Sequence, residues 1–291
     1  MNIAYFAPGT IHDAKWINHF AENKKNNVIL FSRKNLNKKE HLYFSNKVDI
    51  HPILDSYSLY PYKKRKTKKK IEKILKDKKV QLCHCLYAVP YALWCNEFSL
   101  PYVITTRGSD IFQDLNLPNG PNNSIRKRVL NWLTKKQLIK SFKQSKYITS
   151  TSIKQQLVLK ELVNESKLKL IRTGVNFNKL ALIKKENPHK SSTIKILSPR
   201  NLMPFFNIHL ILDGFAELIK KHQKKLFELH IIDNFRNSEY SKNLNEKIKV
   251  LNISKYCFFY PQQSMIEMAK LISQSDIIIM IPSTDGSPSS A

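Results

Sequence analysis

Cysteine is scarce in this sequence, and its spacing excludes two kinds of site. Only four cysteines occur among the 291 residues, and no Cys-x-x-Cys pair is present. A structural zinc site or a redox dithiol would need such closely spaced thiols. No other spacing of His, Cys and Asp indicates a metal site, so we expect no bound metal. A reducing, cytoplasmic compartment fits this cysteine usage best.

Long apolar runs and secretion signals are also absent. No stretch of about 18 apolar residues occurs, so we expect no transmembrane helix. The first six residues lead directly into a strand-like run, without the charged and apolar regions of a signal peptide. No Gly-x-Ser-x-Gly turn marks a nucleophilic serine. With 42% apolar and 10% aromatic residues, the composition is that of a globular protein, and we expect a cytoplasmic one.

Acidic residues are few, and the basic ones are unevenly distributed. The 22 acidic residues stand against 49 Lys and Arg, which gives a formal net charge of +27. Residues 63–79 hold eleven Lys and Arg with two acids, and residues 115–160 hold no acid at all. Such a surface would attract a polyanion, either nucleic acid or an anionic membrane face. The alternative is a set of solvated helix faces.

Short apolar runs of strand character alternate with amphipathic stretches of helical spacing along the whole chain. This alternation predicts an α/β protein with parallel, doubly wound sheets and helices on both faces. The expected strands form two series, 2–6, 28–32, 80–84, 102–106, 147–150 and 168–172, followed by 194–198, 227–232, 256–260 and 276–281.

A polar stretch containing Pro188 separates the two series. We interpret residues 179–193 as a linker between domains. The first domain then covers residues 1–178 and the second covers residues 194–291. Because the second series stops after four strands, we expect the second domain to be incomplete, short by two or three βα units.

The loops that follow the strands hold the candidate functional residues, because ligands bind beyond the carboxyl ends of strands in open α/β sheets. Gly9 would let the backbone approach a ligand closely, although a structural turn explains it equally well. Arg107 and Arg200 each follow a strand, where a guanidinium suits a diphosphate. For Arg107 the alternative is a structural ion pair with Asp110.

The ordered set of loops resembles glycosyltransferase family 4, the retaining enzymes whose GT-B architecture has two facing Rossmann-like domains. The segments that carry the resemblance are Phe6-Ala7-Pro8-Gly9 with His12, Thr106-Arg107-Gly108-Ser109-Asp110, Gly174-Val175-Asn176, Ser198-Pro199-Arg200 with Asn207, and Pro282-Ser283-Thr284-Asp285-Gly286-Ser287-Pro288. The last segment is similar to the beginning of the family's Glu-x7-Glu donor motif. The resemblance covers the whole chain.

The resemblance implies a retaining, hexosyl-type glycosyltransferase that needs no metal or other cofactor. Its partners would be a nucleotide-sugar donor and a glycan or lipid-linked acceptor, and its setting bacterial surface polysaccharide or lipopolysaccharide synthesis. Arg200 would stabilise the leaving diphosphate, and Asp285 would lie near the transferred sugar. The predicted site residues are Arg200, Asp285 and Arg107 as catalytic groups, Gly9, Asn207, Gly286, Ser287 and Pro288 at the donor, and His12, His84, Ser109 and Asp110 on the acceptor side.

Two of the acceptor-side residues have structural alternatives. His12 could be a helix-start histidine with a backbone partner, and His84, at the end of its expected strand, could be a packed side chain. Three positions also depart from the family pattern. Arg107 stands where many members have His, Asp285 replaces Glu, and the lysine expected about five residues after Arg200 is missing.

The sequence ends at Ala291, before the second acid of the donor motif. We therefore expect weak donor binding and an inactive chain. Alternative functions are a GT-B nucleotide-sugar epimerase, an inactive fragment, and a charge-driven nucleic-acid-binding protein. No epimerase motif and no nucleic-acid reader motif is evident, so we expect no nucleic-acid partner. Peripheral attachment to the inner face of the cell membrane is a further hypothesis, based on the basic helices.

Overall fold

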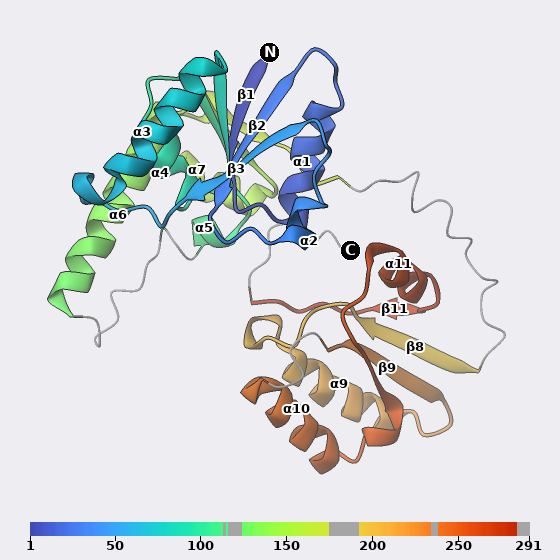
Figure 1. Ribbon diagram of the computed structural model, residues 1–291. Coiled ribbons are helices and arrows are strands. Elements are labelled where there is room, and N and C mark those ends of the chain that lie inside the picture. The colour runs from blue at the N-terminus through green and yellow to red at the C-terminus, as the bar shows by residue number, and fades with distance from the viewer. Residues whose placement is uncertain (113–114, 116–123, 175–191, 234–237, 284–291) are drawn as a thin grey trace. The chain divides into compact units, whose positions relative to one another are not determined.

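The computed structural model describes residues 1–112, 115, 124–174, 192–233 and 238–283. The chain divides into two compact units, Met1–Thr173 and Gly174–Ala291. Each unit has a parallel sheet and a hydrophobic core of its own (Figure 1). The α/β class with two parallel sheets, predicted from the sequence, is confirmed. Most of the predicted linker, residues 179–193, lies outside the described residues.

Seven parallel strands form the sheet of the first unit, in the order β3-β2-β1-β4-β5-β6-β7. Their bounds are β1 Asn2–Phe6, β2 Asn27–Arg33, β3 Val48–Leu54, β4 Leu82–Leu86, β5 Tyr102–Thr105, β6 Tyr147–Ser150 and β7 Leu168–Leu170. Central strand β1 pairs with both β2 and β4. The strand order therefore changes direction at β1, and such a switch point is where open α/β sheets bind ligands.

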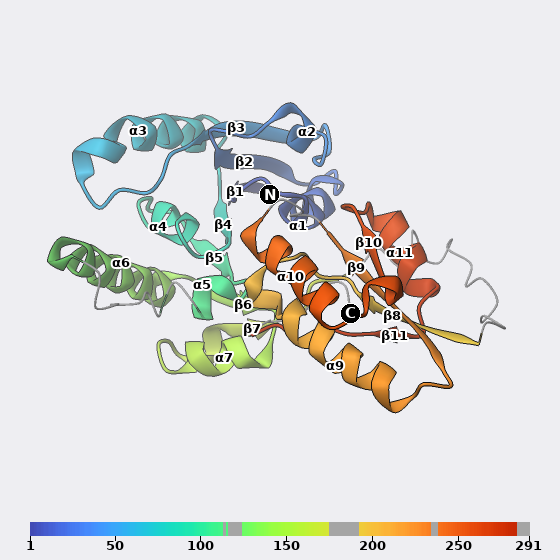
Figure 2. The same ribbon diagram turned by 90° about the horizontal axis from the view of Figure 1, so that it is seen from below.

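Helices cover both faces of this sheet (Figure 2). They are α1 Ile11–Ala21, α2 Lys38–His41, α3 Pro61–Asp77, α4 Tyr91–Cys95, α5 Ser109–Phe112, α6 Ile125–Gln144, α7 Ile153–Lys160 and the 3-10 turn η1 Glu165–Lys167. On one face, Ala14 and Ile17 of α1 pack with Tyr5 in the core. On the other, α3, α4, α6 and α7 cover Phe6 and Phe31. The first unit is thus doubly wound.

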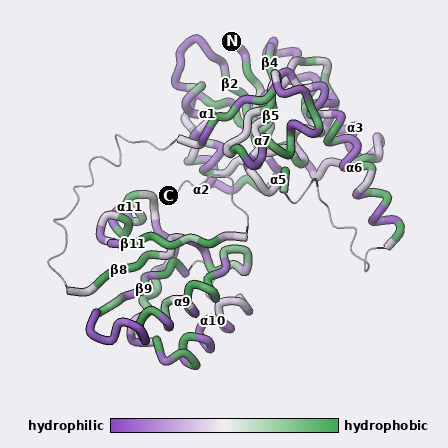
Figure 3. Tube along the Cα trace, turned by 180° about the vertical axis from the view of Figure 1, so that it is seen from behind, coloured by the Kyte–Doolittle hydropathy of each residue, from purple (hydrophilic) through white to green (hydrophobic). Residues whose placement is uncertain are grey.

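The second unit has four parallel strands in the order β10-β9-β8-β11. Its elements are β8 Thr193–Ser198, η2 Pro204–Phe206, α9 Ile208–Lys221, β9 Leu226–Ile232, α10 Glu239–Val250, η3 Ser254–Tyr256, β10 Cys257–Tyr260, α11 Met265–Ser273 and β11 Ile277–Ile278. The apolar stripe of α9, with Ile211 and Phe215, packs on Leu229 and Ile231 of β9. Strands β8 and β11 are largely hydrophobic (Figure 3).

Local sequence signals explain where several helices begin. Ser152 and Ser238 accept hydrogen bonds from backbone N–H groups three residues later, at the starts of α7 and α10. Helix α11 begins with a reciprocal capping box between Ser264 and Glu267. These side chains satisfy N–H groups that have no partner within the helix.

Two features of the first sheet differ from the sequence prediction. Strand β3 was not predicted, because its central residues are only half-buried and Pro52 interrupts it. It lies at the edge of the sheet, where a proline is tolerated. Strand β4 continues to Leu86, so the prediction that His84 lies at a strand end is wrong. His84 is the central residue of β4, and its neighbours Cys83 and Cys85 point to the opposite face of the sheet, into the core.

Candidate functional site

The carboxyl ends of β1, β4 and β5 bring together the first-unit residues that the sequence singled out. Gly9 follows β1 in a left-handed conformation, with φ of +87°. A Cβ at this position would lie 2.6 Å from Leu36 Cδ1 and 3.3 Å from Ser32 Cβ. The turn therefore requires glycine on conformational grounds.

Asp13 lies directly beneath this turn, and its side chain is fully buried. Its Oδ2 accepts hydrogen bonds from the Gly9 N–H at 3.0 Å, the Thr10 N–H at 2.7 Å and the Thr10 hydroxyl at 2.9 Å. Thr10 and Asp13 form a capping box at the start of α1. The other carboxylate oxygen, Oδ1, lies 2.7 Å from Nη2 of Arg107.

Arg107 is held through its side chain by Asp13 and through its backbone by Asp110. The Asp110 Oδ1 accepts from the N–H groups of Arg107 and Gly108, each at 2.9 Å, and its Oδ2 accepts from the Ala88 N–H at 2.8 Å. Burial raises the pKa of Asp110, while these hydrogen bonds act in the opposite direction. The alternative prediction, a side-chain ion pair between Arg107 and Asp110, is wrong because Asp110 is occupied by backbone donors.

Ser109 connects the loop after β5 with the loop after β4. Its hydroxyl lies 2.7 Å from the hydroxyl of Tyr87, a residue with φ of +90°. Ser109 and Asp110 also begin the short helix α5. Ser109 and Asp110, two of the predicted acceptor-side residues, therefore help to hold these two loops together.

His84 projects from the same face of the sheet as Tyr5, and their rings are 5.1 Å apart. Its Nε2 lies 2.7 Å from the Thr105 hydroxyl, which in turn lies 2.7 Å from the Thr149 hydroxyl. Burial, reinforced by the Arg107 charge, lowers the pKa of His84 to about 4. The imidazole is therefore neutral at pH 7 and is packed within the sheet.

His12 lies in the first turn of α1 and is exposed. Crowding by the surrounding protein lowers its pKa, and the positive charges of Arg107 and Lys15 act in the same direction. Asp13 opposes them. Three basic side chains thus lie near this helix start, and Arg107 pairs with the buried carboxylate of Asp13.

In the second unit, Arg200 follows β8. Its guanidinium carbon lies 5.0 Å from the centre of the Phe206 ring, within the range of a cation–π contact. Asn207 has φ of +52°, and its Nδ2 donates to the Ile281 carbonyl at 2.9 Å and to the Ser283 hydroxyl at 3.2 Å. The loop after β8 is thereby tied to the segment after β11.

The remaining predicted donor residues cannot be placed. Asp285, Gly286, Ser287 and Pro288 lie outside the described residues. Within the part of the chain that the structure describes, no group of three or more His, Cys, Asp or Glu side chains could hold a metal ion.

Two residues that organise this site, Asp13 and Tyr87, were not predicted from the sequence. A signal for Asp13 was present, since Thr10-x-x-Asp13 has the spacing of a capping box. Its second contact, with Arg107, joins residues on different loops and has no local signal. The left-handed conformation of Tyr87 has no local signal either, because bulky residues rarely adopt it.

Two family profiles match the chain, one over each unit. The profile described as "Glycosyl transferase 4-like" matches residues 2–152, and the profile "Glycosyl transferases group 1" matches residues 181–291. No curated protein sequence matches the chain.

Several solved structures are similar in fold. A glycosyltransferase from Rickettsia africae has a TM-score of 0.67 at 18% identity, over 97% of this chain and 73% of its own. The lipopolysaccharide outer core galactosyltransferase WaaB, in its apo form, has a TM-score of 0.67 at 13% identity, over 99% and 76%. The Anabaena protein HepE in complex with UDP has a TM-score of 0.64 at 15% identity, over 98% and 75%. At these identities the likeness concerns the fold alone.

Proposed function

Because this chain belongs to the glycosyl transferase 4-like family of GT-B glycosyltransferases, we propose that it moves a hexose from a nucleoside diphosphate sugar to a glycan or lipid-linked acceptor, with retention of configuration. The observation that carries the proposal is that glycosyltransferase profiles match both units, residues 2–152 and 181–291. The HepE structures with UDP and UDP-glucose support a nucleotide-sugar donor.

Arg200 is the proposed electrostatic catalyst on the donor side. It follows β8 at the carboxyl edge of the second sheet, where ligands of α/β folds bind. Negative charge grows on the diphosphate as the bond to the sugar breaks, and a guanidinium fixed nearby stabilises that charge. The Phe206 ring supports this role because it orients the arginine. Asp285 is the proposed acid near the transferred sugar.

On the acceptor side we assign the binding surface to the carboxyl ends of β1 and β5. Arg107 carries a permanent positive charge there, and the exposed His12 has a lowered pKa, which favours its neutral form. A neutral imidazole can accept a hydrogen bond from a sugar hydroxyl, which a charged imidazolium cannot do. We expect the reaction to need no metal or other cofactor.

The test is sugar transfer by the full chain from a panel of radiolabelled nucleoside diphosphate sugars to lipid and glycan acceptors. We expect Arg200→Ala to lower kcat about 100-fold, the effect of removing one transition-state donor. Arg65→Ala is the matched control, because Arg65 is an exposed arginine of α3. Sugar transfer by the wild type, against the inactivity expected from the sequence, supports the proposal. Transfer from no donor, or an Arg200→Ala variant as active as Arg65→Ala, contradicts it.

A lipid-linked acceptor would bring the first unit to a membrane surface, and α6 is suited to that contact. Ile125, Val129 and Trp132 are 79%, 49% and 57% exposed on this helix. Basic residues flank them, and no acid occurs in α6. Hydrophobic and hydrophilic stretches alternate along the helix (Figure 3). An apolar face bordered by cations binds to anionic bilayers.

No helix in the described part of the chain has the length and apolar character needed to span a bilayer. We propose peripheral attachment at the inner face of the cell membrane, in bacterial surface polysaccharide or lipopolysaccharide assembly; the resemblance to WaaB supports this setting. Flotation with anionic vesicles should carry the chain upward, and Trp132→Ser should weaken it. Binding that is equally strong to zwitterionic vesicles, or unaffected by Trp132→Ser, would contradict attachment through α6.

A further inference from the structure

One buried carboxylate joins the two loops that carry Gly9 and Arg107. Asp13 has no exposed surface, although its side chain is charged. Burying a carboxylate is unfavourable unless hydrogen bonds and an opposite charge compensate for the lost water. Asp13 has both, since three donors surround Oδ2 and the Arg107 guanidinium lies against Oδ1.

Helix capping accounts for the contacts of only one of the two carboxylate oxygens. The capping box at the start of α1 uses Oδ2, which accepts from Gly9 and Thr10. A neutral side chain such as Gln or Asn could perform that function. The second oxygen lies 2.7 Å from Arg107 Nη2, a contact that requires a negative charge to be strong.

The orientation of Arg107 is thereby fixed at both ends. Asp110 holds its backbone N–H, and Asp13 holds Nη2. A guanidinium has five N–H donors in one plane. The ion pair at Nη2 and the backbone hydrogen bond together restrict the directions in which the other donors can point. The Arg107 side chain as a whole is one-fifth exposed.

We propose that Asp13 is the positioning residue of this site, which holds the Arg107 guanidinium in the orientation that meets the bound substrate and couples that orientation to the Gly9 turn. The kinetic part of this inference rests on the proposed glycosyltransferase function. The structural part, that Arg107 loses its fixed orientation without the Asp13 charge, does not.

Two variants separate positioning from capping. Asp13→Asn keeps a carbonyl oxygen that can accept from Gly9 and Thr10 but removes the charge that faces Arg107. Thr10→Ala removes one capping hydrogen bond, the hydroxyl contact at 2.9 Å, and leaves the contact between Asp13 and Arg107 in place. If Asp13 only capped α1, Asp13→Asn and Thr10→Ala would have similar effects on Arg107.

The first measurement uses the guanidinium signals of the ¹⁵N-labelled full chain in NMR spectra, with Arg107 assigned by its loss in Arg107→Lys. In the wild type we expect a resolved, slowly rotating Arg107 guanidinium. Asp13→Asn should average or lose this signal, and Thr10→Ala should retain it. A signal that is absent from the wild type, or unchanged in Asp13→Asn, would overturn the proposal whether or not the chain transfers sugar.

The second measurement is kinetic. Asp13→Asn should lower kcat at least about tenfold, and the double variant with Arg107→Gln should be no slower than Arg107→Gln alone, since both changes remove one function. Guanidinium ion should restore activity to Arg107→Ala but not to Asp13→Asn/Arg107→Ala. Additive losses of kcat in the double variant would contradict a positioning role for Asp13. Equal rescue of Arg107→Ala and Asp13→Asn/Arg107→Ala by guanidinium ion would contradict it as well. If the wild type transfers no sugar, the proposed function fails, while the NMR result still decides the role of Asp13.

Discussion

Gly9 adopts φ of +87° at the end of β1, and its N–H is one of three donors around Asp13 Oδ2. Asp13 then contacts Arg107 with its other oxygen. Asp13 therefore contacts both Gly9 and Arg107. The same loops hold His84 in a neutral state, because burial and the Arg107 charge both disfavour its protonation.

Gly9→Ala should destabilise the first unit by about 2 kcal/mol, through a left-handed backbone that alanine disfavours and a Cβ too close to Leu36. Gly174→Ala is the matched control, because no atom lies within 4 Å of the added Cβ and its φ is outside the left-handed range. Urea denaturation of both variants measures the difference. Equal free energies of unfolding would refute the conformational requirement at Gly9.

His84 should make the first unit less stable in acid. Its pKa is about 4 in the fold, against an ordinary value of 6.5. Between these values the unfolded chain binds a proton that the folded chain does not, so the free energy of unfolding falls as the pH drops through that window. The loss should be about 2 to 3 kcal/mol between pH 7 and pH 4.5.

His84→Gln removes the titrating group and keeps a side chain that can hydrogen-bond to Thr105. We expect urea denaturation at pH 7 and pH 4.5 to show that the free energy of unfolding falls less in this variant than in the wild type. The difference should be about 2 to 3 kcal/mol. Both proteins retain the same carboxylates, whose contribution therefore cancels. Parallel pH profiles would mean that folding does not lower the pKa of His84.

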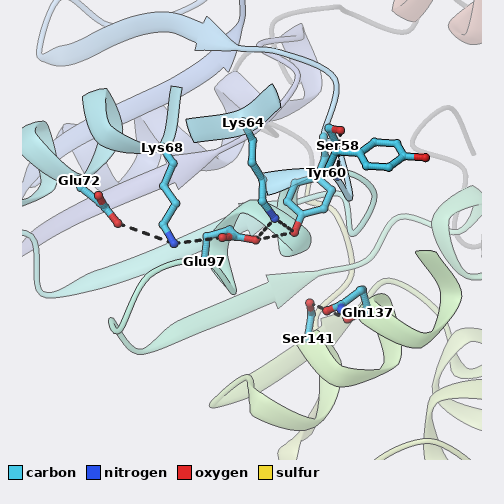
Figure 4. Close-up of polar contacts among 9 residues, drawn as sticks. Ser58, Tyr60, Lys64, Lys68, Glu72, Glu97, Gln137 and Ser141 are labelled. Atoms are coloured by element: carbon cyan, nitrogen blue, oxygen red, sulfur yellow. Dashed lines mark hydrogen bonds and ion pairs between the residues drawn. The ribbon is translucent and has the colours of Figure 1, made fainter. Parts of the chain in front are cut away.

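At the scale of elements, α3 is anchored to the sheet by polar contacts as well as by its apolar face. Glu97, from the loop before β5, contacts Lys64 and accepts from Lys68 Nζ at 3.1 Å (Figure 4). Tyr57 donates its hydroxyl to Glu97 at 2.6 Å. Burial acts to raise the pKa of Glu97, but these contacts outweigh it and lower the pKa. The Glu97 carboxylate thus has three partners, two of which are lysines of this strongly basic helix.

Glu97→Gln should destabilise the first unit by about 3 kcal/mol, because it leaves the Lys64 charge largely buried, with a side chain only 12% exposed, and without its carboxylate. Glu72→Gln is the control. Glu72 also faces Lys68, but at 3.8 Å and with half of its side chain exposed, and such pairs contribute less than about 1 kcal/mol. Thermal unfolding of the two variants should differ clearly, and equal melting temperatures would show that the Glu97 cluster is not stabilising.

At the scale of the whole molecule, the chain consists of two units with separate cores. The first has a seven-stranded sheet closed on both faces by helices. All three tryptophans, Trp16, Trp94 and Trp132, belong to it, and Trp94 is fully buried. Tryptophan fluorescence of the full chain therefore reports the unfolding of the first unit alone.

A fragment of residues 1–173 should fold by itself, since its core is complete within those residues. Its urea unfolding, followed by tryptophan fluorescence, should be cooperative and should have the midpoint that the full chain shows with the same probe. Circular dichroism should confirm mixed helix and sheet content. A fragment without a cooperative transition would contradict an independent first unit.

The sequence by itself determined the fold class, the family and the strand ends from which Arg107 and Arg200 extend. These follow from hydrophobic periodicity and from short loops whose residues are neighbours in the chain. Edge strand β3 was not predicted because its half-buried pattern and Pro52 resemble a loop. Strand β4 was predicted too early in the chain, because its apolar residues Cys83 and Cys85 alternate with His84 and form no continuous apolar run.

Only the tertiary structure decided which charges meet. Asp13 reaches Arg107 because β1 and β5 lie on either side of β4 in one parallel sheet, so that their carboxyl ends open at the same edge. Asn207 reaches Ile281 for the corresponding reason, since β8 and β11 are paired neighbours. The neutrality of His84 likewise depends on burial among residues from other strands. Contacts of this kind join segments distant in sequence, and their geometry depends on strand order and register.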